Sequence, residues 1–466
     1  MSKLAKALSA ASGNSSASSL YVEDVFSTYL YSGTDATQVI TNGVDMTEGG
    51  LVWCKTRATD SNHVLVDSEY SMNNANKNFV SSNTNTAATT GPAIDSFNST
   101  GFTLSSNWYA NYASYGTYVS WSFRKAENFF DVVTFSGNSV AGRAISHGVD
   151  GAVGMVIIKR TDSAGNWAVW NVGASTSSFF LNSTAAAYSA PQNMFGNGSS
   201  VVAPTSTAFT VGANSTVNAS GGTYVAYVFA SDAGGFGDDG DENIIKCGTY
   251  TEAASSFEVT LGWEPQFILA KPSSTSGDWY LLDTMRGFNH TTDSRLEANN
   301  SVAEDIYQNY WSPAATGFNT PSGYWGAGTE VIYMAIRRPM KTPESGTEVF
   351  TADTRGSTGD GVNPTYRSAW PVDMALLRNV GYSSASTMLT PRLTGSQYMY
   401  ANQTYAEAAA NTVVVWDFMN GWYNDTGTNT AQVSWMFRRA TGFMDVVCFT
   451  GDSGNTNQRV LHNLTV

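Results

Sequence analysis

The sequence predicts an all-β protein built as a tandem array of four antiparallel β-sandwich domains of a jelly-roll-like type. Three observations lead to this prediction. The composition favours strands and turns, a short apolar strand motif recurs four times, and further strand motifs recur beside it in the same order. Because the repeat is about 105 residues long, it has the size of a whole sandwich domain and is too long for a solenoid repeat.

The composition is rich in residues that form strands and tight turns. The 466 residues include 43 glycines, and aromatic residues make up 13% of the chain, as much as the charged residues. An average soluble protein has roughly 25% charged residues. Aromatic, β-branched and glycine residues favour strands joined by turns over helices. The neutral, polar character that remains is typical of the surface of a structural protein.

The charge and hydropathy of the chain exclude two classes of partner. A net charge of −14 repels a phosphate backbone, so we expect no nucleic acid as a partner. No apolar run approaches the roughly 18 residues of a membrane-spanning helix, so we expect no membrane insertion. Three cysteines without a CxxC partner are expected to be buried free thiols, namely Cys54, Cys247 and Cys448.

The first repeated motif is an apolar run that ends in a cation. Such a run, without alternation, is typical of a strand buried on both faces. We expect its central residue to be buried in every unit, and Trp53 is the largest of them. The four copies are Leu51–Lys55, Met155–Lys159, Phe267–Lys271 and Met374–Arg378, with Trp53, Ile157, Leu269 and Leu376 at their centres.

A second strand ends twelve residues after each cation, at Asp67, Asn171, Asp283 and Thr390. A constant step of this length indicates a hairpin in which the two strands face each other across a short turn. We therefore expect each cation to have a structural role and to pair with the polar residue twelve positions later, Lys55 with Asp67 and Lys271 with Asp283. The alternative is that the four cations line a ligand groove.

A third motif closes each unit, with large residues at alternate positions as in a strand that has one face toward a core. Its copies are Tyr118–Phe123, Tyr224–Phe229, Glu330–Ala335 and Gln432–Phe437, which places Trp121, Tyr227, Tyr333 and Trp435 at equivalent positions.

These repeats divide the chain into an N-terminal tail, four sandwich units and the start of a fifth. The boundaries are 1–20 for a flexible tail, 21–126, 127–235, 236–342 and 343–440 for the sandwiches, and 441–466 for an opening strand. This last strand is expected because Met444–Gly451 closely matches Phe130–Gly137, the motif that opens the second unit. A lone opening strand cannot bury its apolar face in water. Either the natural chain continues, or this strand completes the sheet of another unit or another chain. The glycine-rich joint at 231–242 is expected to be loose.

Few residues suggest chemistry at a site. The acidic joint offers Asp238, Asp239 and Asp241 as a weak candidate Ca²⁺ site, because carboxylate oxygens beside a glycine turn suit that ion, although a solvated linker is the simpler interpretation. The four histidines stand far apart in the sequence, and no nucleophile elbow or phosphate loop occurs. We expect no catalytic residues, no cofactor and no enzyme activity.

One loop of the first unit is rich in aromatic residues. Trp108, Tyr109, Tyr112 and Tyr115 are candidate binding residues, because aromatic rings give rigid contact area while small polar neighbours adapt to a ligand. The alternative is a low-charge surface without a ligand. The first nineteen residues are cationic and mildly apolar and cannot fold alone, so we expect them to dock on another protein or to remain a disordered tail.

Several segments resemble a family. Met1–Leu8 with its Ser/Ala/Gly linker, Leu20–Gly33, Gly101–Leu104, Val153–Arg160 and Gly222–Phe229 resemble repeat-containing, fibre-like virion appendage proteins of marine tailed phages, especially cyanophage podoviruses. The repeats of those proteins look like concanavalin-type or laminin-G-type jelly rolls. The resemblance covers the whole chain but is weak at 363–372 and 413–420 of the fourth unit.

The resemblance implies a structural phage virion protein, a tail or capsid fibre or appendage that projects from the particle. It implies assembly in the host cytoplasm, localisation to the virion, a homo-oligomer, and docking of the N-terminal segment on other virion proteins. A carbohydrate-binding adhesin is the alternative, with a host surface glycan as partner, and a polysaccharide-cleaving tailspike is a third. The resemblance carries over no catalytic residue.

Overall fold

The computed structural model describes residues 19–307, 311–355, 364–409, 414–424, 431–449, 451 and 458–464. These residues form a nearly all-β protein with antiparallel strand pairs throughout, as the sequence predicts. Their two α-helices are single turns, α2 (Val22–Val25) and α3 (Ser215–Asn218). Short 3-10 turns occur at Met46–Glu48, Ala113–Tyr115, Val172–Ala174, Pro191–Asn193, Gly346–Glu348 and Arg392–Thr394. The N-terminal segment expected to dock lies outside the described residues.

Each sandwich has an inner sheet of long strands and a smaller outer sheet. In the first sandwich the inner sheet has the order β1 (Phe26–Ser32), β7 (Thr117–Arg124), β3 (Gly50–Thr56), β4 (Val64–Asp67), and the outer sheet β2 (Gln38–Thr41), β6 (Gly101–Leu104), β5 (Ile94–Asn98). In the second, the inner sheet is β8 (Phe130–Ser136), β14 (Thr223–Ala230), β10 (Val153–Arg160), β11 (Ala168–Asn171), β12 (Phe179–Phe180), and the outer sheet β9 (Arg143–Ser146), β13 (Ala208–Val211).

The third and fourth sandwiches repeat this arrangement. In the third, the inner sheet is β15 (Ile245–Thr251), β23 (Glu330–Arg337), β17 (Pro265–Pro272), β18 (Tyr280–Asp283), β19 (Asp293–Glu297), β20 (Asp305–Tyr307), and the outer sheet β16 (Glu258–Thr260), β22 (Gly317–Asn319), β21 (Ser312–Ala314). In the fourth, the inner sheet is β24 (Phe350–Thr354), β32 (Gln432–Phe437), β26 (Met374–Asn379), β27 (Thr387–Pro391), β28 (Gln397–Tyr400), β29 (Ala408–Ala409), and the outer sheet β25 (Tyr366–Arg367), β31 (Gly421–Asn424), β30 (Val414–Val415).

The twelve-residue step forms the predicted hairpin in the first three sandwiches. In the fourth, Pro391 and not Thr390 lies opposite Met374, so the step is one residue longer than predicted. In the first, β3 pairs with β4 so that Trp53 faces Leu65 on one side and Trp121 of β7 on the other. The equivalent position in the third sandwich corrects the sequence alignment by one residue. Leu269 faces Met334, so Met334 and not Tyr333 is the equivalent of Trp121 and Tyr227.

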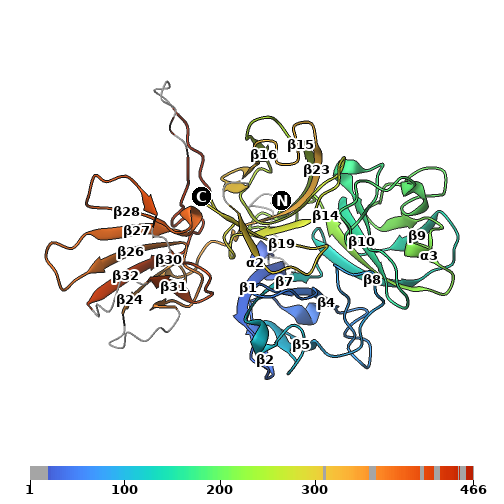
Figure 1. Ribbon diagram of the computed structural model, residues 1–466, viewed down its shortest axis with the longest axis horizontal. Coiled ribbons are helices and arrows are strands. Elements are labelled where there is room, and N and C mark those ends of the chain that lie inside the picture. Colours follow the sequence, from blue (N-terminus) through green and yellow to red (C-terminus); the bar gives the residue numbers. More distant parts are fainter. Residues whose placement is uncertain are drawn as a thin grey trace, which may run out of the picture.

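The first three sandwiches share one hydrophobic core. The inward faces of their inner sheets meet around a common centre, and Phe123 of the first lies 5.6 Å from Phe229 of the second and 6.1 Å from Phe267 of the third, between ring centroids. One cluster of buried residues runs from Val22 to Met340. Figure 1 shows the three sandwiches grouped around this centre, with the fourth beside them. We call residues 22–338 the three-sandwich ring, a tighter unit than the separate domains expected from the sequence.

The shared core explains why the repeated apolar runs do not alternate. One face of each inner sheet packs in the common core, and the other packs against the outer sheet of its own sandwich, as Val52 and Cys54 do in the first. Both faces of β3, β10 and β17 are therefore buried, as predicted. Trp53, Ile157 and Leu269 are at most 4% exposed. The prediction is wrong for Leu376, since β26 of the fourth sandwich is buried only at alternate positions.

Candidate functional site

The predicted ion pairs between the cations and the residues twelve positions later do not form. The register of β3 and β4 places Asp67 opposite Leu51, and that of β17 and β18 places Asp283 opposite Phe267. Lys55 lies four residues further along β3, which is roughly 13 Å at about 3.3 Å for each residue of a strand. A hairpin brings together residues equidistant from its turn, and the cation and the acid are not.

The buried lysines instead bind backbone carbonyl groups, and two of them reach the preceding sandwich. Lys159 donates to Gly165 O at 2.8 Å and to Asn85 O of the first sandwich at 3.4 Å. Lys271 donates in the same way to Gly277 O at 2.6 Å and to Thr184 O of the second sandwich at 3.2 Å. Burial lowers the pKa of each of these two lysines to about 8. Their role is structural, as expected, but their partners are carbonyls.

Lys55 completes this set within the first sandwich. It is 1% exposed and donates to Thr56 O at 2.9 Å. Burial lowers its pKa to about 8, although Asp60 and Glu304 act in the opposite direction.

In the three-sandwich ring, the polar residues that end the second strands bind a neighbouring sandwich. These residues are Asp67, Asn171 and Asp283. All three are fully buried, and each one meets the closing strand of another sandwich. The bonds are Trp121 Nε1 to Asp283 Oδ2 at 3.0 Å, Tyr227 OH to Asp67 Oδ2 at 3.1 Å, and Asn171 Nδ2 to the carbonyl O of Tyr333 at 3.2 Å. They join the first sandwich to the third, the second to the first, and the third to the second, so they close a cycle.

The chemistry of this cycle explains why one of the three positions holds an amide. Trp121 and Tyr227 carry N–H or O–H donors, and each donates to a carboxylate. Met334 stands at the third equivalent position and has no donor. Asn171 supplies the donor itself and binds a backbone carbonyl. Each buried polar group is thus satisfied, which buried groups require.

A second cycle uses the residue eight positions after each lysine. His63, Trp167 and Trp279 occupy this position, and each binds a backbone carbonyl of the preceding sandwich in the ring. The bonds are His63 Nε2 to Glu297 O at 3.0 Å, Trp167 Nε1 to Ser81 O at 3.0 Å, and Trp279 Nε1 to Phe180 O at 3.0 Å.

His63 gives the ring a dependence on pH that can be measured. It is 0% exposed, and its Nδ1 accepts a hydrogen bond from Trp53 Nε1 at 2.8 Å. The imidazole of His63 is therefore neutral, with its proton on Nε2. Burial, with Lys55 nearby, lowers the pKa of His63 well below its usual range. The unfolded state takes up a proton near pH ~6.5 and the folded state does not, so the stability contributed by neutral His63 is present above that pH and is lost below it.

We predict that the free energy of unfolding falls by up to about 1.4 kcal/mol for each pH unit below ~6.5, relative to His63→Gln. Urea unfolding of both proteins between pH 5 and 7.5 measures the difference, in which the contributions of all other titrating groups cancel. A difference that does not change with pH would contradict the prediction, because His63 would then take up its proton over the same pH range in the folded and unfolded states.

A buried charge network joins the first, third and fourth sandwiches. Arg286 is fully buried and binds Asp283 at 2.6 Å and Glu304 at 2.8 Å. Glu304 also binds Arg57 of the first sandwich at 2.6 Å, and Arg57 binds Asp417 of the fourth at 2.5 Å. Burial opposes ionisation of Glu304, but the two arginines outweigh it and lower its pKa. Burial likewise opposes the charge of Arg57, and the two carboxylates outweigh it and raise its pKa.

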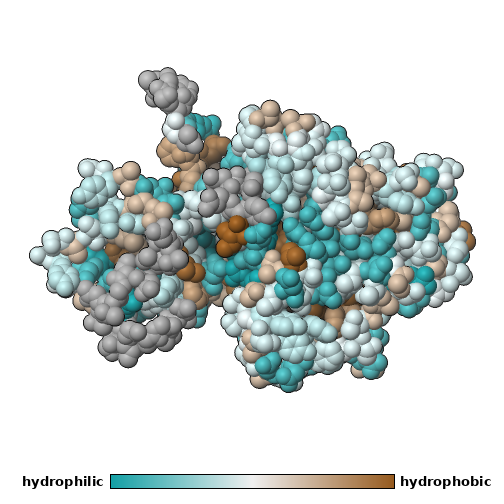
Figure 2. Space-filling view, in the orientation of Figure 1, coloured by the Kyte–Doolittle hydropathy of each residue, from teal (hydrophilic) through white to brown (hydrophobic). Residues whose placement is uncertain are grey.

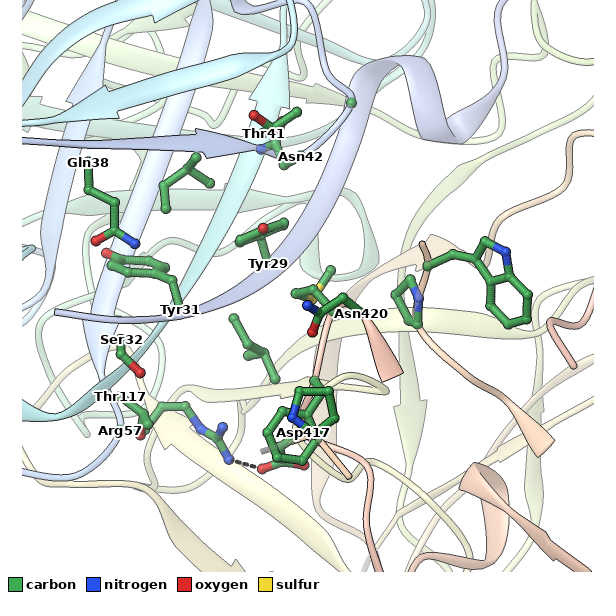
Figure 3. A pocket seen from close by; sticks show the side chains of 18 of the residues that line it. Tyr29, Tyr31, Ser32, Gln38, Thr41, Asn42, Arg57, Thr117, Asp417 and Asn420 are labelled. Carbon is green, nitrogen blue, oxygen red and sulfur yellow. Dashed lines mark hydrogen bonds and ion pairs between the residues drawn. The ribbon is translucent and has the colours of Figure 1, made fainter. Parts of the chain in front are cut away.

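A large groove opens beside this network, between the first and fourth sandwiches. Its volume is about 1120 Å³. Figure 3 shows Tyr29, Tyr31 and Gln38 on one side and Asn420 on the other, with Arg57 reaching across to Asp417. The lining combines aromatic rings with amide, hydroxyl and charged groups, which is the chemistry of a polar ligand site.

The aromatic loop predicted as a binding surface forms a ladder beside the groove. Tyr109 contacts Trp108 and Tyr112, and Tyr112 contacts Tyr115, with ring centroids 5.1 to 6.5 Å apart. Tyr109 is 41% exposed. Tyr118 connects the two features, since its ring stacks on Tyr31 of the groove at 5.1 Å and its hydroxyl donates to Tyr112 O.

The acidic joint does not assemble the candidate Ca²⁺ site. Asp238, Asp239 and Asp241 are exposed, and Asp238 accepts a hydrogen bond from Tyr21. That bond, with a smaller effect of burial, raises the pKa of Tyr21 to about 12. In the described part of the chain, no three His, Cys, Asp or Glu side chains gather as a metal site would need. Gly237 N donates to Leu20 O, so the joint holds the start of the chain.

The prediction of buried free thiols is confirmed for two of the three cysteines. Cys54 and Cys247 are buried free thiols, and burial raises the pKa of Cys54 to about 12, while Cys448 is half-buried. No helix among the described residues is long and apolar enough to cross a membrane. Figure 2 shows a surface that is mostly weakly polar, with apolar atoms gathered at the base of the arm formed by the last described residues.

Residues 22–338 match the family model described as a domain of unknown function, DUF7483. The chain belongs to this family. The matched segment is the three-sandwich ring, so the domain that defines the family coincides with the unit that shares one core. The chain matches no curated protein. The fourth sandwich lies outside the matched segment.

Sequence reasoning found the ladder but missed the groove. The ladder comes from one short loop, so its composition was visible. The groove combines Tyr29, Arg57, Glu304 and Asp417, which lie far apart in the sequence. The only signal was their residue type, and arginine and acidic residues are not rare enough to mark a site.

Proposed function

We propose that this DUF7483 protein is a structural virion protein of a phage, a fibre-like appendage of repeated sandwiches that projects from the particle and contacts the host. The observation that carries the proposal is the pair of closed hydrogen-bond cycles between the sandwiches. These hydrogen bonds join the three sandwiches into a single unit, which suits a protein that must keep its shape outside the cell. The resemblance to appendage proteins of marine tailed phages supports the same role.

The use of the buried ionisable groups favours a structural role over catalysis. Lys159, Lys271, Asp67, Asp283 and Arg286 are each fully buried and bonded to a neighbouring strand or sandwich. An active site needs such groups to face a substrate. Here they face the interfaces that hold the ring together.

The test is the location of the chain on particles. Virions purified from infected host cells are expected to contain the full-length chain by mass spectrometry, and an antibody to the three-sandwich ring is expected to label a projecting structure in electron micrographs. The major capsid protein serves as the positive control. Absence of the chain from purified, labelled particles would overturn the proposal.

A second function, binding of a host surface glycan, is favoured by the ladder and the groove. Exposed aromatic rings pack on the apolar faces of sugars, and amide and hydroxyl groups bind sugar hydroxyls. Both kinds of group are present in the first sandwich, with Tyr109 and Tyr112 in the ladder and Gln38 and Asn42 in the lining of the groove.

We predict that Tyr109→Ala weakens glycan binding by at least about 1 kcal/mol, roughly fivefold, because it removes the most exposed ring of the ladder. A glycan array followed by calorimetry on a binding sugar measures the loss. Val140→Ala, at a residue of the second sandwich that is 60% exposed, is the control and is expected to leave affinity unchanged. If Tyr109→Ala binds the sugar as tightly as Val140→Ala does, the ladder is not the glycan-binding site. Release of reducing sugar ends from the glycan would instead indicate a tailspike enzyme.

A further inference from the structure

The fourth sandwich has the same inner sheet as the three sandwiches of the ring. The strand order β24-β32-β26-β27-β28 repeats the order β8-β14-β10-β11-β12 of the second sandwich. The register is also equivalent, since Leu376 faces Trp435 and Leu389 as Ile157 faces Tyr227 and Val169. Every residue of the inner face in one sandwich therefore has a known counterpart in the others.

The inner face is buried in the ring and exposed in the fourth sandwich. Phe350 is 40% exposed, while its counterparts Phe26, Phe130 and Ile245 are 0 to 2% exposed. Met399 is 39% exposed, while its counterparts Val80, Phe179 and Leu296 are each 1% exposed. The rest of this face is half-buried and comprises Met374, Leu376, Leu389, Val433, Trp435 and Phe437. The exposure is specific to the face that the other three sandwiches use to meet one another.

This face is apolar although its residues are half-buried or exposed in a single chain. Residues on the solvent side of a half-buried sheet are normally polar, and a contiguous apolar patch marks an interface. The edges of the patch carry further exposed apolar residues, Val380 at 58%, Tyr382 at 63% and Tyr405 at 71%. Their counterparts in the ring lie in the loops that contact the next sandwich, where Ala88 N donates to Thr161 O and Gly277 N to Thr184 O.

The polar positions of this face only partly repeat those of the ring. Trp435 stands where Trp121 and Tyr227 donate to a neighbouring sandwich. Pro391 faces Met374 as Asp67 faces Leu51 and Asp283 faces Phe267, so the receiving position holds no side-chain acceptor. The apolar residues of the face, and not a repeated polar pair, therefore carry the argument for association.

The ring already shows what covers such a face, which is the same face of two further sandwiches. The three-sandwich ring has used its own three faces, so it offers none to the fourth sandwich. Two more copies of the chain offer two more identical faces, and closed rotational symmetry is the common solution for identical subunits. We propose that three copies of this chain associate through their fourth sandwiches around a three-fold axis, in the arrangement that the ring adopts within one chain.

This inference goes beyond the virion role and does not depend on it. A trimer of this kind would hold three rings around one central stalk of fourth sandwiches, and it would triplicate the ladder and groove. Failure of the virion test would leave the association state untouched, and a monomeric chain could still be found on particles.

The test is the mass of the full chain in solution. Light scattering after size exclusion, and mass photometry at lower concentration, are expected to give three times the 49.8 kDa of one chain. The double variant Phe350→Lys and Met399→Lys is expected to be monomeric. Both side chains already reach solvent in the single chain, so the charged variants are expected to keep the far-ultraviolet spectrum of the parent.

The matched control is Arg367→Ala, an exposed change on the outer sheet of the same sandwich, which is expected to remain trimeric. A parent chain that is monomeric at tens of micromolar, or that forms dimers or open-ended polymers, would overturn the proposal. A trimer that persists in the Phe350→Lys and Met399→Lys variant with an unchanged spectrum would equally overturn it, because the association would then use another surface.

Discussion

Replacing Trp53 with alanine is expected to lower the free energy of unfolding of the three-sandwich ring by about 3–5 kcal/mol. Trp53 is 4% exposed, packs edge-on against Trp121 with ring centroids 5.9 Å apart, and donates to His63. Truncation leaves a cavity in the shared core, and it also removes the donor that fixes His63 in the tautomer that binds Glu297 O of the third sandwich. The substitution therefore weakens an interface as well as a core.

Urea unfolding, followed by tryptophan fluorescence and circular dichroism, measures the effect. Val39→Ala is the control, because Val39 is 63% exposed in the same sandwich and its truncation is expected to change stability by less than about 0.5 kcal/mol. A Trp53→Ala effect as small as that of the control would contradict the position of Trp53 in the shared core.

The strands could be predicted because burial on both faces leaves a plain signal. A run such as Met155–Ile158 is apolar at every position, and the hairpin step from Lys159 to Asn171 recurs in the first and third units. Composition and repetition were therefore enough for the fold class. They could not show that the sandwiches share a core, because an apolar face has the same residues whether it meets its own sheet or another sandwich.

The roles of the polar repeat residues could not be predicted, because their partners come from other sandwiches. Lys271 and Asp283 have opposite charges and a fixed spacing, which suggested a pair within the hairpin. The structure gives Lys271 the carbonyl of Thr184 and gives Asp283 the indole of Trp121. Sequence repetition shows which positions are equivalent but not which unit supplies the partner.

In the fourth sandwich, residue type alone gave a wrong prediction of burial. Leu376 was predicted to be buried because its counterparts are, and within one chain it is only half-buried. Its residue type is that of a core position, whereas its surroundings in one chain are those of a surface. The mismatch between sequence and environment is what points to the missing neighbours.

Asn171 indicates that the cycle between sandwiches tolerates an amide where no cation stands beside it. The same Asp→Asn substitution is therefore expected to change stability by different amounts at two equivalent positions. Asp67 and Asp283 are equivalent, and both are 0% exposed. Asp283 binds Arg286, which is itself fully buried, at 2.6 Å, and the guanidinium lies over the Trp121 ring at 5.3 Å. Asp67 has no such cation. It accepts bonds from Tyr227 and from the backbone amides of the turn that follows β4, and burial raises its pKa.

Asp283→Asn is therefore expected to cost about 3–5 kcal/mol, because it leaves a buried guanidinium without one of its two carboxylates. Asp67→Asn is expected to change stability by less than about 1 kcal/mol. The amide oxygen can replace Oδ1, which accepts from the backbone amides, and the hydroxyl of Tyr227 can accept from Nδ2 instead of donating to Oδ2. The charge that is lost is opposed by burial. Urea unfolding of the two variants and the parent at pH 7.5 measures both effects. Asp239→Ala, in the exposed acidic joint, is the control for removal of a carboxylate alone. Equal losses of stability in the two asparagine variants would contradict this prediction, because the cost would then come from the hydrogen-bond cycle that both sites share and not from the charge of Arg286.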